Sequence, residues 1–68
     1  MTRQEFAGLL AVKQVLIYER SRYESSITYW TTGKGASNAS AQKSIEFCKT
    51  RIEAINTAIE TIDCYKPE

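Results

Sequence analysis

The chain has 68 residues, of which 43% are apolar and 25% charged, and its formal net charge is +1. A chain this short makes one small domain with a marginal core, and its balanced charge gives no reason to expect nucleic acid or an acidic partner. There is no histidine, and two cysteines cannot supply the four ligands of a zinc site, so we expect no metal and no cofactor.

The two cysteines, Cys48 and Cys64, lie sixteen positions apart on a segment that we predict to be helical. That separation is about 24 Å along a helix axis, which is too far for an intrachain disulfide. Without a disulfide or a metal, self-association is the expected source of extra stability. No apolar run is long enough to cross a membrane or to form the core of a signal peptide, so we expect a cytoplasmic protein with reduced thiols.

Residues 3–30 are predicted to form one long helix. Thr2 followed by Glu5 fits a capping box, and the segment contains no proline. Its central apolar stripe consists of Leu9, Val12, Leu16, Tyr23, Ile27 and Trp30. Further apolar residues flank this stripe on both sides of the first half of the helix, and one partner helix covers only part of such an arc. We therefore expect the first half to contact more than one neighbour.

Residues 31–38 are predicted to be the connection to a second helix. Their two glycines permit backbone angles that other residues avoid, and Ser37 or Asn38 suits a helix N-cap. The second helix is expected over 38–63, followed by a short tail of residues 64–68. Pro67 in this tail indicates that the helix has ended. Its apolar residues alternate four and three positions apart, which indicates one continuous seam facing a partner helix. The seam consists of Ala41, Ile45, Cys48, Ile52, Ile55, Ile59 and Ile62.

Two helices of similar length joined by a short connection predict an antiparallel hairpin, so residues 1–68 are expected to form a single all-α domain. Pairing positions whose numbers add to about 69 places Leu16 against Ile52 and matches apolar residues on every layer. The same register predicts an ion pair between Glu19 and Arg51 on the flank of the seam.

A homo-oligomer is predicted from apolar residues that the hairpin leaves over. Alanines spaced along the second helix allow close approach of another helix. The simplest assembly is a dimer of hairpins that makes a four-helix bundle, with larger rings or interlocked hairpins as alternatives. The predicted oligomer interface consists of Phe6, Leu10, Ile17, Phe47, Ala54, Ala58 and Tyr65.

Catalytic residues are not evident. Without histidine, a nucleophilic site would need Ser-Lys, Cys-acid or paired carboxylates. The acidic residues of the second helix, such as Glu53 and Glu60, are expected on its solvated face. We therefore predict that the protein is not an enzyme.

The connection between the helices carries the residues best suited to a small anionic ligand. Hydroxyls, backbone amides, an ammonium group and a helix N-terminus suit a phosphate, and an aromatic ring can stack on a base. The candidate residues are Tyr29, Trp30, Thr31, Thr32, Lys34 and Ser37. The segment is not a P-loop, because Gly35 follows Lys34 and no strand precedes it. The alternative is a plain connection with Trp30 covering the end of the bundle.

A second candidate surface lies on the outer face of the first helix, where Tyr18, Arg22 and Ser25 fall near one another. A mixture of tyrosine and arginine is typical of protein or nucleic-acid contacts, and a solvated face is the alternative.

The overall plan resembles the Rop family of plasmid regulators. The resemblance rests on Met1-Thr2, on Gln4-Glu5 and on the predicted hairpin. It implies a dimeric hairpin that binds paired RNA loops through the first helix. Here the connection is longer and glycine-rich, and Leu10 and Ile17 make part of the first helix apolar where that family is polar and basic. No binding residues are carried over.

The leading hypothesis is a small homo-oligomeric protein that acts by binding a macromolecular partner, as an inhibitor or adaptor does. The first alternative is an oligomeric binder of a phosphate-bearing or nucleotide-like ligand at the connection. The second alternative is Rop-like RNA binding.

Overall fold

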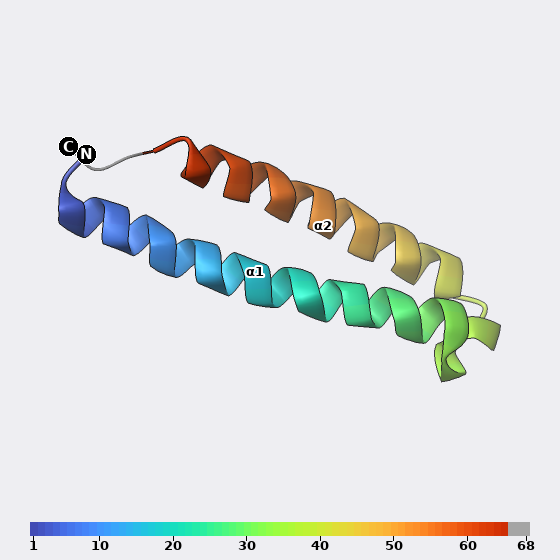
Figure 1. Cartoon of the computed structure of the whole chain (residues 1–68). Coiled ribbons are helices and arrows are strands. Elements are labelled where there is room, and N and C mark those ends of the chain that lie inside the picture. Colours follow the sequence, from blue (N-terminus) through green and yellow to red (C-terminus); the bar gives the residue numbers. More distant parts are fainter. Residues whose placement is uncertain (66–68) are drawn as a thin grey trace.

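Two long helices joined by a short connection make up the computed structural model of the chain, which describes residues 1–65. Helix α1 runs from Arg3 to Thr32, and helix α2 runs from Ala41 to Asp63. They lie side by side in opposite directions, with the start of α1 near the end of α2 and the connection at the other end (Figure 1). The predicted all-α hairpin is confirmed. Pro67, which we used as a stop signal, lies outside the described residues.

The capping box at the start of α1 is confirmed. The Glu5 backbone N–H donates to the Thr2 hydroxyl, and the Thr2 backbone N–H donates to the Glu5 carboxylate, each over 3.1 Å. The hydrogen bond from the Thr2 backbone, followed by that with its side chain, lowers the pKa of Glu5 below its ordinary value.

Helix α1 ends two residues beyond the predicted boundary. The hydroxyls of Thr31 and Thr32 donate back to the carbonyls of Ile27 and Thr28, over 2.8 and 3.0 Å. The Gly33 N–H donates to the carbonyls of Thr28 and Tyr29. The Gly33 bonds close the last turn of the helix, whereas threonine hydroxyls make the same bonds at Thr28 and Thr50 within the helices.

Helix α2 begins later than predicted, and the prediction that Ser37 or Asn38 is its N-cap is wrong. Residues Lys34–Ser37 form a single turn of 3₁₀ helix, η1, and the N-cap position of α2 falls at Ser40. Asn38 instead stabilises the turn before α2, where its side-chain oxygen accepts a hydrogen bond from the Ser40 backbone N–H over 2.8 Å. The connection therefore spans residues 33–40 and not 31–38.

The register of the hairpin departs from the predicted one along one edge and agrees with it on the other side. Lys13 pairs with Asp63 over 2.5 Å, and Arg20 donates to the Asn56 side chain over 2.7 Å. These two pairs each add to 76, above the predicted sum of about 69. On the other side of the hairpin, the rings of Tyr23 and Phe47 pack together and their numbers add to 70, which agrees with the predicted register.

The predicted seam of α2 is confirmed as the core. Its buried residues are Ala41, Cys48, Ile55, Ile59 and Ile62. Helix α1 has no buried residue along its 30 positions, although it carries more apolar side chains than one neighbour can cover. The molecule is correspondingly thin, with extents of 52 × 15 × 12 Å.

Candidate functional site

The connection is held against the end of α1 by two aromatic rings. Tyr29 and Trp30 pack edge to face, with ring centroids 5.1 Å apart. Gly35 is buried against both rings, and a Cβ atom on it would come within 2.6 Å of Tyr29 and 2.7 Å of Trp30. None of the glycines has a positive φ. Gly35 is therefore required for space, and the positive φ angles that glycine permits are not used here.

The donors proposed for an anion at this end are partly engaged within the chain. The Thr31 and Thr32 hydroxyls bond to carbonyls of α1. The backbone N–H groups of Gly33, Ala36 and Asn38 are also bonded to carbonyls. Lys34 and Ser37 lie exposed on η1 beside this cluster. The structure thus brings the six candidate residues to one end of the hairpin but leaves few free donors that converge on a single point.

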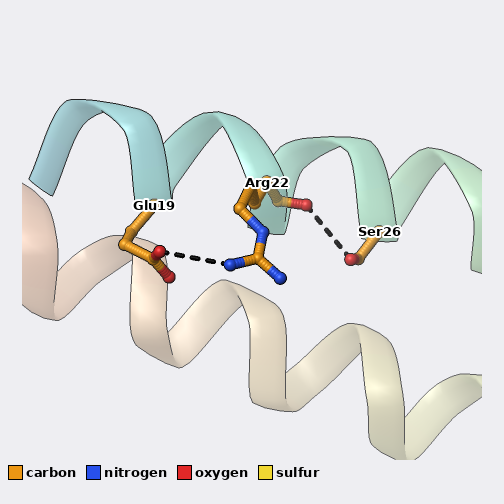
Figure 2. A network of polar contacts seen from close by, with 3 residues as sticks. All are labelled: Glu19, Arg22 and Ser26. Carbon is orange, nitrogen blue, oxygen red and sulfur yellow. Dashed lines mark hydrogen bonds and ion pairs between the residues drawn. The ribbon is translucent and has the colours of Figure 1, made fainter. Parts of the chain in front are cut away.

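The predicted outer surface of α1 is open to solvent. Tyr18 is 65% exposed, and Arg22 and Ser25 are exposed as well. Arg22 donates to the Glu19 carboxylate over 3.3 Å, while its own carbonyl accepts the Ser26 hydroxyl over 3.1 Å (Figure 2). Because Arg22 is three residues further along the same helix, it takes the place of Arg51 as the partner of Glu19. Among the described residues, Glu19 pairs with Arg22 and not with Arg51, so the predicted Glu19–Arg51 ion pair is wrong.

Arg51 lies instead over an aromatic ring on α2. Its guanidinium carbon is 5.5 Å from the centre of the Phe47 ring, and Phe47 in turn packs edge to face with Tyr23 of α1 at 6.2 Å. Phe47 is nevertheless 57% exposed. The cluster presents an aromatic knob with a positive charge beside it, an arrangement that occurs at protein interfaces.

Next to this knob the surface is hollowed. A depression of about 310 Å³ opens between the two helices, and Glu19 and Arg51 both line it without pairing. We call the surface that contains the knob and this hollow the Phe47 face. It consists of Leu16, Glu19, Tyr23, Phe47, Arg51, Ala54 and Ala58.

The seven residues predicted for the oligomer interface do not form one continuous surface. Phe47, Ala54 and Ala58 lie on the Phe47 face, and Tyr65 lines another depression, beside Leu9. The other three, Phe6, Leu10 and Ile17, lie on the opposite edge of α1. Leu10 and Ile17 are three and four positions from Lys13, the residue that bonds to α2 along that edge.

Sequence reasoning missed Tyr23 and Arg51 as surface residues. Tyr23 was placed in the seam by its spacing, and Arg51 was assigned to an ion pair within the hairpin. The available signal was the position of Arg51 four residues after Phe47 on the same helix, where an arginine can stack on an aromatic ring.

No three His, Cys, Asp or Glu side chains within residues 1–65 are grouped so that they could hold a metal ion. Neither of the helices described here is long and apolar enough to span a bilayer. Comparison of the chain with protein-family models, curated proteins and solved structures finds no match.

Proposed function

We propose that the chain is a non-enzymatic helical hairpin that self-associates and acts by binding a macromolecular partner, as an inhibitor or adaptor does. The observation that supports this proposal is that no side chain of α1 is fully buried: Leu9, Leu16 and Tyr23 are only half-buried. A helix with a wide apolar arc normally packs against several neighbours, and this hairpin supplies only one. The remaining surface of α1 is available to other chains.

The partner surface that we propose is the outer face of α1, around Tyr18, Arg22 and Ser25. Tyr18 and Val15, one turn apart, are 65% and 61% exposed. Tyrosine and arginine contribute more binding energy at interfaces than most residues do, because they combine large contact area with hydrogen bonding. Tyr18, Arg22 and Ser25 are all exposed, and the bond between Arg22 and Glu19 places this surface beside the Phe47 face.

The two alternatives have less support. A phosphate-bearing ligand at the connection would have to compete with the internal hydrogen bonds of Thr31, Thr32 and Gly33. An RNA partner would be attracted mainly by positive charge, and the net charge of the chain is only +1.

The experiment compares three immobilised proteins in extracts of the native host: the wild type, a Tyr18→Ala Arg22→Ala variant, and a Lys49→Ala Glu53→Ala control on the exposed side of α2. We expect one macromolecule to be retained by the wild type and the control but lost from the Tyr18 Arg22 variant. Prior nuclease treatment distinguishes a protein from an RNA. Equal retention by all three proteins would contradict the proposed surface.

A further inference from the structure

The hairpin exposes more surface than a compact protein of its mass. Its accessible surface is 5184 Å², whereas a folded monomer of 7.7 kDa is expected to expose about 4300 Å². The radius of gyration is 15.6 Å, against about 11 Å for a compact domain of this length. The surplus of about 850 Å² is close to the roughly 800 Å² that one partner contributes to an interface of standard size. The surplus area is thus what one stable interface would cover.

We infer that a second copy of this chain docks on the Phe47 face, so that α2 of each copy packs against α1 of the other and Arg51 of each copy faces Glu19 of the other. The inference rests on the self-association included in the proposed function and specifies the surface and the orientation.

The shape of the Phe47 face suits a copy of itself. It contains a projecting group, Phe47, beside a hollow whose α2 wall includes the small residues Ala54 and Ala58. Small side chains let a second helix approach closely, and the projecting ring gains cover when it does. A surface that carries both a projection and a hollow can be self-complementary, as a two-fold dimer requires.

The charges on the face determine the orientation of the second copy. Glu19 on α1 and Arg51 on α2 line the same hollow. A two-fold axis that crosses the hairpin at this level would place α1 on α1 and α2 on α2, and like charges would then meet. An axis along the hairpin places α1 on α2, and each Arg51 then meets the Glu19 of the other copy. Like-charge contacts across an interface are strongly unfavourable, so the second arrangement is preferred.

The opposite edge of the hairpin lacks this complementarity. Leu10 and Ile17 are 42% and 38% exposed there. The two cations along that edge, Lys13 and Arg20, are already bonded to Asp63 and Asn56 of the same chain. Both cations of that edge are thus bonded to the other helix of the same hairpin, whereas Arg51 on the Phe47 face has no acidic partner among residues 1–65 and lies over the Phe47 ring.

The test uses single charge reversals of the full-length protein, measured by light scattering over a range of concentrations. We expect the wild type to have twice the monomer mass of 7.7 kDa. Glu19→Arg and Arg51→Glu should each raise the dimer dissociation constant at least about tenfold, because each creates two like-charge contacts. Glu53→Arg and Lys49→Glu make the same changes of charge at exposed positions of α2 and should leave the dimer unchanged. Circular dichroism checks that each variant remains helical.

Mixing the two weakened variants tests the orientation. In a one-to-one mixture of Glu19→Arg and Arg51→Glu proteins, both contacts across the interface become opposite in sign, so the mixture should form a dimer of one copy of each. A mixture that stays monomeric, or single reversals that leave the dimer intact, would overturn this arrangement. A wild type that is monomeric at all concentrations would instead refute self-association itself, whereas the partner surface on α1 is tested separately by the retention experiment.

Discussion

Gly35 lies so close to Trp30 that a Cβ atom on it would come within 2.7 Å of the indole Cε3 atom. The ring of Tyr29 is equally close on the same side, with its Cε1 atom 2.6 Å from that Cβ position. Contacts this short are not tolerated between real side chains without movement of one of them. The two rings and the glycine therefore form a packed end of the hairpin, made from neighbouring segments of the chain.

Gly35→Ala should destabilise the hairpin by about 1–3 kcal/mol, which is the usual cost of adding a methyl group to a packed site. The backbone at Gly35 does not have a positive φ, so the expected cost is steric. Urea denaturation followed by circular dichroism at 222 nm measures the change in free energy of unfolding.

Gly8→Ala is the matched control. Nothing lies within 4 Å of a Cβ at this exposed position in α1, and alanine is a better helix former than glycine. We expect stabilisation of about 0.5–1 kcal/mol. If the two substitutions changed stability in the same direction, the packed end of the hairpin would be refuted.

The hydrogen bond between Arg20 and Asn56 is expected to couple the two helices. It is 2.7 Å long and partly buried, and its donor is charged. A double-mutant cycle with Arg20→Ala and Asn56→Ala should give a coupling free energy of about 1 kcal/mol, reduced from the buried value by partial exposure to solvent.

The comparison pair is Arg22 with Glu19 on α1. Both side chains are more than a third exposed, at 65% and 37%, and an exposed pair of this kind couples weakly. A cycle with Arg22→Ala and Glu19→Ala should therefore give less than about 0.5 kcal/mol. A stronger coupling in this exposed pair than between Arg20 and Asn56 would show that the Arg20–Asn56 hydrogen bond does not couple α1 to α2.

The two helices could be predicted from sequence because their signals are local and repeated. The alternating spacing from Ala41 to Ile62 requires one buried side of a helix, and five of these seven positions are buried. The Thr2–Glu5 capping box likewise depends only on residues three positions apart.

The connection and the pairs along the Lys13 edge could not be predicted in the same way, because they depend on contacts between segments. The packing of Gly35 on Tyr29 and Trp30 moves the start of α2 to Ala41. The backbone N–H of Gly33, which donates to the carbonyls of Thr28 and Tyr29, closes α1 at Thr32. The candidate site depended on a contact within α1: Glu19 pairs with Arg22, and Arg51 is left on the Phe47 face.

The capping box predicts how the start of α1 responds to acid. The pKa of Glu5 is lowered in the folded chain, so ionised Glu5 stabilises the fold at pH values above its ordinary pKa of 4.5. That contribution is lost as the pH falls through the lowered pKa. Glu5→Gln removes the ionisation, so the difference in Tm between wild type and variant should be constant above about pH 5.5 and shrink toward acid. A difference that grew below pH 4 would contradict the lowered pKa.

The two cysteines should report separately on the end and the core of α2. Cys48 is buried in the seam, and Cys64 is exposed just beyond the last residue of the helix. A thiol reagent should therefore modify one equivalent rapidly, and Cys64→Ser should abolish this fast phase. The second equivalent should react only as the hairpin opens, at a rate that rises with urea as the population of unfolded chains rises. Cys48→Ala should remove that slow phase and leave the fast phase unchanged. Rapid modification of both thiols in the native protein would show that the seam around Cys48 is not packed.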